Sequence, residues 1–275
     1  MIAVLSEKTE QQQQRSYMPV ITLTSDWGIK DHYLASVKGA IMKQAPGTGI
    51  VDISHMITPH DLTEAAFVIR NCYRDFPAGT IHIIGVSTEE SERSPHTAIL
   101  AGGQYFIGAD NGIFSLIFDE PPEKIVEITL MQDSEYFTFS SRDRFVKAAA
   151  LLAQGEDITA LGPERDSINE KILFAPVAEK DVIKGLVIYV DNYGNLITNI
   201  HRNRFREVGR NRVFSIIVRT EEIRRIHESY ADVPVGELLA LFGSHGFLEI
   251  AINNGTAGGL LGLNPTDTVR VEFRD

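Results

Sequence analysis

The chain has 275 residues, of which 43% are hydrophobic and 23% are charged, and this composition excludes wholesale disorder and fibrous repeats. Its 26 Lys and Arg residues face 37 Asp and Glu residues, and the formal charge of -11 disfavours nucleic acid or an anionic membrane as a partner. A cationic ligand suits that charge better. The length allows one or two domains, each with a sizeable core.

The beginning of the chain and its single cysteine bear on location. Residues 1–17 show no sustained apolar period and are expected to form an N-terminal extension. No apolar stretch approaches the roughly 20 residues of a membrane span, and no signal-like segment is evident. Cys72 has no partner for an intramolecular disulfide, and its neighbours indicate a buried thiol. We therefore expect a cytoplasmic protein.

Strand and helix patterns alternate after residue 18. Apolar, β-branched runs predict strands, and runs with a helical period predict helices between them. The predicted elements are strand 18–24, helix 32–44, strand 49–53, helix 61–72 capped by Asp61 or Thr63, strand 80–86, a hairpin of 96–101 and 104–108, and helix 142–154. This alternation predicts a layered α/β domain over residues 18–172.

The pattern changes after Pro163. Short strand-like runs follow one another, separated by Gly, Asn and Asp turns. These runs are 181–190, 197–200, 213–218, 238–242, 247–252 and 268–273. We expect a second, smaller and mostly β domain over residues 175–275.

Several polar residues stand where these elements end. Asp26 follows a predicted strand, so its carboxylate is expected at the edge of the sheet where α/β proteins bind ligands, although it could equally cap a turn. The segment 191–195 offers a carboxylate, Tyr193 and an amide, which suits a ribose and a stacked base, but it could also be a plain hairpin turn. Residues 110–112 and 244–246 fit ordinary turns.

Known catalytic signatures are missing from the sequence. It contains no phosphate-binding GxxxxGK[ST], no HExxH, no CxxC pair and no GxSxG. Phosphoryl transfer by a P-loop and zinc hydrolysis are therefore disfavoured.

Eight segments, taken together and in order, carry a resemblance to a known family. They are 24–28 (TSDWG), 38–39 (KG), 51–55 (VDISH), Asp61, 76–80 (FPAGT), 106–112 (FIGADNG), 191–199 (DNYGNLITN) and 248–251 (LEIA). The set resembles the S-adenosyl-L-methionine (SAM) hydroxide adenosyltransferases, which are related to the SAM-dependent fluorinase and chlorinase. The resemblance spans nearly all of residues 18–275.

The resemblance implies a fold, an assembly and a reaction. It implies an N-terminal α/β domain, a C-terminal β-barrel-like domain, and a homotrimer that binds SAM between neighbouring subunits. In this family water attacks C5′ of the ribose and expels methionine, which leaves adenosine. The resemblance implies no metal and no organic cofactor, and SAM itself is the substrate.

Binding residues are carried over by position. Asp26 matches the carboxylate that holds the ribose hydroxyls. Asp191 and Asn195 match contacts to the methionine and the adenine, and Tyr193 stands where an aromatic ring stacks on the base. Three further positions match substrate contacts: His60, Phe139 and Ser244.

Catalysis is where this sequence departs from the family. The hydrolases carry an Asp in Val-Asp-Pro-Gly-Val-Gly and a His in Thr-Phe-His-Gly-Arg-Asp, and these positions are Ser87 and Ser140 here. Arg93 corresponds, one residue out of register, to a family arginine. Ser141 falls at the halide-binding serine of the halogenases, whereas Glu90 would repel an anion there.

These departures leave several interpretations open. Glu90, Arg93 and Ser141 could form a rebuilt site for the attacking water, or Glu89, Glu90 and Glu92 could form a solvated acidic loop. A SAM hydrolase is the first hypothesis. The rivals are a catalytically silent binder of SAM or adenosine and an enzyme that acts on another adenosyl compound, while halogenation is disfavoured.

Overall fold

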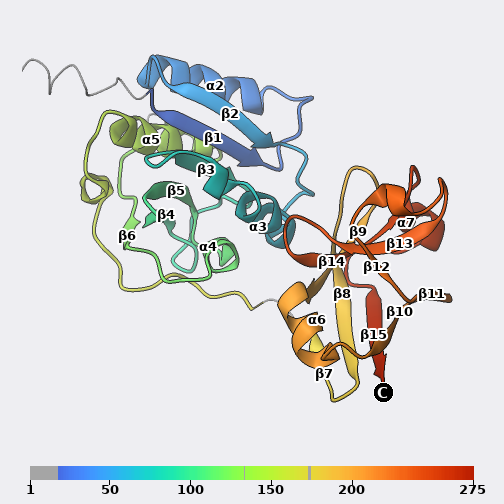
Figure 1. Cartoon of the computed structure of the whole chain (residues 1–275). Coiled ribbons are helices and arrows are strands. Elements are labelled where there is room, and N and C mark those ends of the chain that lie inside the picture. The colour runs from blue at the N-terminus through green and yellow to red at the C-terminus, as the bar shows by residue number, and fades with distance from the viewer. Residues whose placement is uncertain (1–17, 133, 173–174) are drawn as a thin grey trace, which may run out of the picture. The chain divides into compact units, whose positions relative to one another are not determined.

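The computed structural model describes residues 18–132, 134–172 and 175–275 (Figure 1). The predicted N-terminal extension, 1–17, lies outside the described residues. The described residues form two compact units, which divide after Ile172. The first is a mixed α/β unit and the second is a curled sheet, as the sequence predicted.

A six-stranded sheet forms the first unit, in the order β2-β1-β3-β5-β4-β6. Its strands are β1 (Val20–Ser25), β2 (Gly49–Ser54), β3 (Ile81–Gly85), β4 (His96–Ala101), β5 (Gln104–Ala109) and β6 (Lys124–Glu127). β2, β1, β3 and β5 are parallel, whereas β4 runs antiparallel to both β5 and β6. The carboxyl ends of four strands therefore share one edge.

Helices cover both faces of this sheet (Figure 1). One face packs on α2 (Tyr33–Gln44), α5 (Val146–Ala153) and a π-helical turn (Ser141–Phe145), and the other on α3 (Leu62–Arg70) and α4 (Ile113–Ile117). Successive strand residues pack on opposite faces: Ile83 lies in the core with α2 and α5, and Ile84 lies in the core with α3 and α4. Both faces of β1 and β3 are therefore buried, as is usual for parallel strands covered by helices.

The start of α3 is fixed by a side-chain cap. Asp61 accepts hydrogen bonds from the backbone N–H groups of Thr63 and Glu64, at 2.9 and 3.0 Å. Of the two caps that the sequence allowed, the structure selects Asp61.

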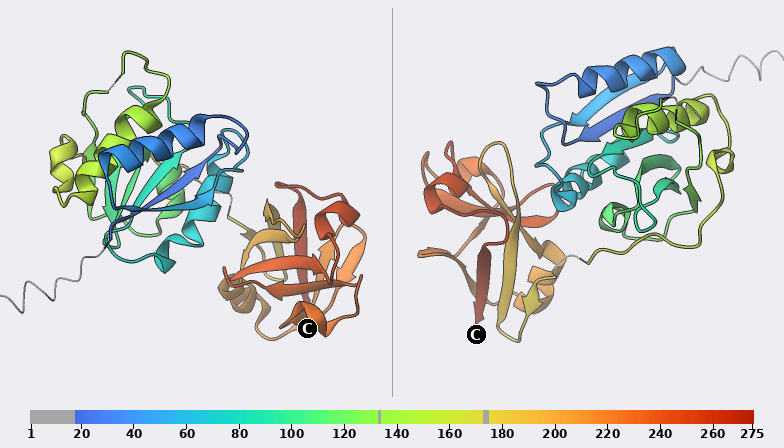
Figure 2. Two further views of the ribbon diagram at one scale, coloured as in Figure 1. Left: turned by 90° about the horizontal axis from the view of Figure 1, so that it is seen from above. Right: turned by 180° about the vertical axis from the view of Figure 1, so that it is seen from behind.

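The second unit is a nine-stranded sheet that curls into a half-barrel (Figure 2). The strands run in the order β11-β10-β15-β8-β9-β14-β13-β12, and β7 pairs with β8. They are β7 (Val177–Ala178), β8 (Val182–Val190), β9 (Leu196–His201), β10 (Val213–Val218), β11 (Glu221–Ile223), β12 (Ile226–His227), β13 (Leu238–Phe242), β14 (Phe247–Ile252) and β15 (Thr268–Arg274). Two helices complete the unit: α6 (Arg202–Gly209) and α7 (Ala257–Leu261).

The half-barrel has its own apolar core, formed by residues such as Ile183, Leu196, Ile216, Leu248 and Val271. Within the described ranges of both units, no helix is long and apolar enough to cross a bilayer.

Candidate functional site

The shared carboxyl edge of the first sheet gathers polar residues from several segments. Asp26 follows β1, His55 follows β2, Ser87 lies two residues beyond β3, and Asp110 follows β5. Open α/β sheets bind ligands at this edge because the loops that leave parallel strands diverge there. The predicted position of Asp26 at a strand end is confirmed.

His60 joins three of these loops. The backbone N–H of His60 donates to Asp26 Oδ2 at 3.0 Å, and His60 Nδ1 lies 3.1 Å from Ser87 Oγ. His60 and Ser87 both have left-handed backbones, with φ values of 66° and 49°. Non-glycine residues adopt this conformation at a cost, and such strain collects at functional sites. Ser87, which stands where the family has an aspartate, is thus in direct contact with His60, a predicted substrate contact.

An aromatic wall stands beside Asp26. The Trp27 ring covers Gly85 so closely that a Cβ atom there would lie 2.2 Å from Trp27 Cζ2. Phe139 meets Trp27 edge to face, with ring centroids 5.8 Å apart, and meets Tyr33 in the same way at 5.3 Å. The structure therefore joins Phe139, a predicted substrate contact, to the loop that carries Asp26.

The π-helical turn begins at Ser141, whose side chain is fully buried. Its Oγ has no hydrogen-bond partner among the described residues. A buried hydroxyl without a partner is costly, and π-turns of this kind occur frequently at functional sites. Ser140 is also buried, one residue earlier.

The Glu90 carboxylate is ion-paired. Arg144 donates to Glu90 Oε1 at 2.5 Å and to Nδ1 of buried His96 at 2.9 Å. His96 therefore carries its proton on Nε2, which donates to the Thr88 carbonyl at 2.9 Å. Burial is the main cause that lowers the pKa of His96, and the Arg144 charge lowers it further. Glu90, with its side chain 42% exposed, is thus neither a free base nor a purely solvated residue.

Sequence reasoning missed Arg144 and His96. The one available signal was a charged residue, Arg144, directly before the run 145–153, which is apolar apart from Lys147. Such a charge within a helix pattern requires a partner, but nothing in the sequence identifies that partner as Glu90.

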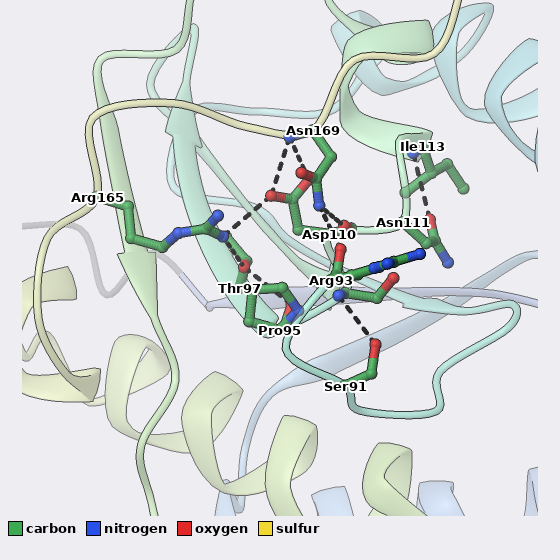
Figure 3. A network of polar contacts seen from close by, with 10 residues as sticks. Ser91, Arg93, Pro95, Thr97, Asp110, Asn111, Ile113, Arg165 and Asn169 are labelled. Carbon is green, nitrogen blue, oxygen red and sulfur yellow. Dashed lines mark hydrogen bonds and ion pairs between the residues drawn. The ribbon is translucent and has the colours of Figure 1, made fainter.

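Buried Asp110 ties the 87–95 loop to the end of the first unit (Figure 3). Asp110 accepts hydrogen bonds from the Arg165 guanidinium and the Asn169 backbone N–H, each at 3.0 Å. The Asn169 amide donates to the Arg93 carbonyl at 2.7 Å, and that of Asn111 donates to the Ser87 carbonyl at 3.0 Å. Burial raises the pKa of Asp110, although Asn169 and Arg165 oppose the rise. Both ends of the loop are therefore anchored.

Arg93 itself presents an exposed side chain. What the network holds is its carbonyl, so the structure fixes the backbone of Arg93 rather than its guanidinium.

In the second unit, the loop 191–195 is an organised hairpin turn between β8 and β9. Asp191 Oδ1 accepts from the N–H groups of Tyr193 and Asn195 at 2.9 and 2.8 Å, and Oδ2 accepts from the Asn195 amide at 3.0 Å. Both carboxylate oxygens thus accept hydrogen bonds from within the loop and stabilise its turn. Asn195 is buried, whereas Tyr193 is 75% exposed.

Ser244 is exposed on the turn between β13 and β14. Close to this turn, buried Glu249 accepts a hydrogen bond from the Tyr230 hydroxyl at 2.6 Å, and His245 Nε2 lies 3.5 Å from its other oxygen. Burial, together with the hydrogen bond to Glu249, raises the pKa of Tyr230. Glu249 stood in the quoted segment 248–251 without a role, and Tyr230 was not among the predicted site residues.

Metal and thiol chemistry find little support in the described parts of the chain. No group of three or more His, Cys, Asp or Glu side chains there is arranged to hold a metal ion. Burial raises the pKa of Cys72 to about 11, with a further contribution from Asp75, so the group is a thiol at neutral pH.

Family models match both units of the chain. The SAM hydroxide adenosyltransferase N-terminal domain matches residues 21–162, and the C-terminal domain of the same family matches residues 185–270. The chain belongs to the SAM hydroxide adenosyltransferase family.

Named relatives match this chain over most of their own length. An (R)-S-adenosyl-L-methionine hydrolase of Thermus thermophilus is 33% identical, across 92% of this chain and 100% of the relative. A protein of the same name from Salinispora tropica is 29% identical, across 92% of this chain and 97% of the relative. A fluorinase from an Actinoplanes species is 26% identical, over 86% of this chain and 91% of the relative.

Two solved structures share the fold of this chain. An uncharacterised conserved protein from Thermotoga maritima superposes with a TM-score of 0.83 at 30% identity, covering 92% of this chain and 99% of the other. A conserved hypothetical protein from Thermus thermophilus gives 0.72 at 29% identity, covering 94% of this chain and 100% of the other.

Proposed function

We propose that this chain hydrolyses S-adenosyl-L-methionine at C5′ to adenosine and L-methionine. The observation that carries the proposal is the full-length similarity to (R)-S-adenosyl-L-methionine hydrolases, at 28% to 33% identity. In the reaction the water oxygen bonds to C5′ as the C5′–S bond breaks. The electron pair of the C5′–S bond stays on sulfur, which becomes the neutral thioether of methionine. One proton of the attacking water passes to solvent.

Asp26 is the proposed ribose-binding residue. A carboxylate can accept hydrogen bonds from both ribose hydroxyls, and such charge-assisted bonds are stronger than neutral ones. The N–H of His60 already holds Oδ2, which fixes the carboxylate plane. Phe139 and His60 are the proposed apolar and polar neighbours of the substrate in the same unit, supported by their contacts around Asp26.

Ser141, Glu90 and Arg93 are the proposed water-site residues. A sulfonium carbon has a good neutral leaving group, so in-line positioning and desolvation matter more than a strong base. The unpartnered, buried Ser141 hydroxyl is suited to hold a water molecule. Because Arg144 pairs with the Glu90 carboxylate, we assign Glu90 a secondary, electrostatic role. Arg93 is included in the water site because it lies in the anchored 87–95 loop.

Residues of the second unit complete the proposal. Tyr193, with its exposed ring, is suited to stack on adenine, and Asp191 shapes the loop that presents it together with Asn195. Ser244 is the proposed methionine carboxylate contact. We propose a homotrimer in which neighbouring subunits supply the two sets of residues, with no cofactor, acting in the cytoplasm.

The direct test uses purified full-length protein with SAM in oxygen-18 water, followed by chromatography and mass spectrometry. Adenosine carrying one oxygen-18 atom, above the level in a protein-free control, is the expected product. Ser141→Ala should slow its formation. Unlabelled product would point to another nucleophile, and SAM or adenosine bound at a one-to-one ratio without turnover would identify a silent binder.

A further inference from the structure

A row of four polar side chains begins at Ser25, the residue before Asp26, and has no part in the proposed chemistry. It runs from Ser25 through His55 and Asp52 to Lys38. Ser25 Oγ is 2.7 Å from His55 Nδ1, His55 Nε2 is 3.2 Å from Asp52 Oδ1, and Lys38 Nζ is 2.6 Å from Asp52 Oδ2.

The charges along this chain determine its proton positions. Partial burial alone would raise the pKa of Asp52, but hydrogen bonds from Lys38 and His55 and the charge of Lys38 lower it overall, so Asp52 is a carboxylate. A carboxylate beside Nε2 favours the tautomer protonated there. Nδ1 is then an acceptor, and the Ser25 hydroxyl donates to it.

Ser25 does not act as a nucleophile in this arrangement. Its side chain is fully buried, and His55 is only 5% exposed, so no substrate atom reaches them. Ser25, His55 and Asp52 are therefore arranged as in a catalytic triad, but the serine hydroxyl is not accessible to a substrate.

An irregular strand register brings His55 to this position. Leu23 pairs with Asp52, but the next residue of β1, Thr24, pairs with Ser54, so Ile53 is an extra residue in β2. A bulge of this kind re-aims the side chains that follow it, and bulges are frequent next to active sites.

His55 contacts both chain neighbours of Asp26 and the residue beyond. Its ring accepts from Ser25 on one side and stacks on Trp27 on the other, with centroids 6.3 Å apart and planes 16° apart. Its carbonyl accepts from the Gly28 N–H at 2.8 Å. The short segment that carries Asp26 is thus held at three points by one residue.

We propose that His55, fixed by Ser25 and Asp52, is a positioning residue that orients the Asp26 carboxylate toward the two ribose hydroxyls. This rests on the proposed role of Asp26 as the ribose-binding residue. A carboxylate accepts two hydroxyls well only when its plane is fixed. An imidazole held at Nδ1 by Ser25, across its face by Trp27, and with Nε2 beside the Asp52 carboxylate supplies such a support.

The test measures ribose discrimination rather than stability. Calorimetry on the full-length protein compares adenosine with 2′,3′-dideoxyadenosine, which lacks the two hydroxyls that Asp26 would bind. The wild-type protein should prefer adenosine, and Asp26→Ala should lose that preference. Ser25→Ala should reduce the preference by about tenfold while binding of the dideoxy compound changes little.

The chain provides a matched control for Ser25→Ala. Thr22 lies on the same strand, is fully buried, and makes a hydroxyl contact of the same 2.7 Å length to Nδ1 of another buried histidine, His82. Thr22→Val removes a comparable hydrogen bond away from Asp26 and should leave the preference for adenosine intact.

Each outcome bears on the proposal. Equal preferences in Ser25→Ala and Thr22→Val would overturn it, because the loss of a buried hydroxyl would then be structural only. His55→Gln, which keeps one polar contact, should retain more of the preference than His55→Ala, and equal values would also count against it. A wild-type protein that binds both nucleosides alike would refute the role of Asp26 itself, and with it this proposal, while the oxygen-18 assay still judges hydrolysis separately.

Discussion

Glu90 illustrates how one neighbouring residue changes the chemistry expected of a side chain. As an unpaired carboxylate it would attract a cationic substrate and repel an anion. In the structure Arg144, only 11% exposed, compensates that charge. The repulsion of an anion is therefore weaker than the sequence alone suggests, and the preference for a hydrolase rests on the hydrolase relatives, which are more similar in sequence than the fluorinases.

Glu90→Gln tests the secondary role assigned to this carboxylate. The change leaves the Arg144 charge without its partner beside the proposed water site, so we expect kcat for SAM hydrolysis to fall about tenfold while KM changes less. Steady-state kinetics measure both constants. Glu120→Gln, at an exposed carboxylate outside the site, is the control. An unchanged kcat would return Glu90 to a purely structural pairing with Arg144.

Site residues differed in how far the sequence could predict them. The position of Asp26 followed from one local fact, a carboxylate directly after a buried strand, and it is confirmed. His55 stood in a quoted segment without a role, because its contacts with Ser25 and Trp27 depend on strand pairing and a bulge. Contacts between segments far apart in the chain, such as Arg144 with Glu90, leave no pattern in a single sequence.

The 87–95 loop and the segment after Gly162 depend on each other. The sequence predicts an ordinary turn at Asp110, yet its carboxylate is fully buried and held by Arg165 and Asn169. The turn geometry at Asp110 was visible in the sequence, but its partners, which lie more than fifty residues later, were not.

Arg165→Met tests this connection. The change leaves a buried carboxylate without its cation, so we expect the free energy of unfolding to fall by about 3 kcal/mol. Urea denaturation at neutral pH measures the difference. Arg224→Met removes a comparable ion pair on the surface, with Glu222, and should shift the midpoint little. A matching small shift for Arg165→Met would show that Asp110 does not depend on the ion pair.

Element predictions succeeded where hydrophobic period was strong and failed where it was weak. Strands such as β1 and β13 and helices such as α2 lie within a few residues of their predicted limits. Helix α6 was missed because its sequence, RNRFREVG, has few apolar residues and lies between strands. Strand β6 is short and follows a Pro pair, so its pattern was too brief to detect.

At the scale of the whole molecule, buried histidines couple folding to pH. His82 is buried in the first unit, between Thr22 and Gln104, at 2.7 and 2.8 Å. Burial lowers the pKa of His82 to about 4, although the hydrogen bond to Gln104 opposes this. The unfolded chain takes up a proton at this residue near pH 6.5, well before the folded protein does.

The first unit should therefore lose stability as the pH falls from about 6.5 to 4, since the unfolded state binds more protons over that window. The contribution of His82 is on the order of 3 kcal/mol across the window. Urea denaturation at pH 7.5, 6 and 5 measures the slope. His82→Gln should flatten it, and an identical slope in the variant would show that other groups cause the acid sensitivity.

The contacts of Asp110 also determine where the first unit ends. The matched family region stops at residue 162, but Arg165 and Asn169 lie beyond it and provide the partners of a buried carboxylate. A fragment cut at 162 would contain every strand and helix of the sheet and still bury an uncompensated charge. A fragment that continues to Ile172 would keep both partners, so the length needed for independent folding is set by a polar network rather than by the last strand or helix.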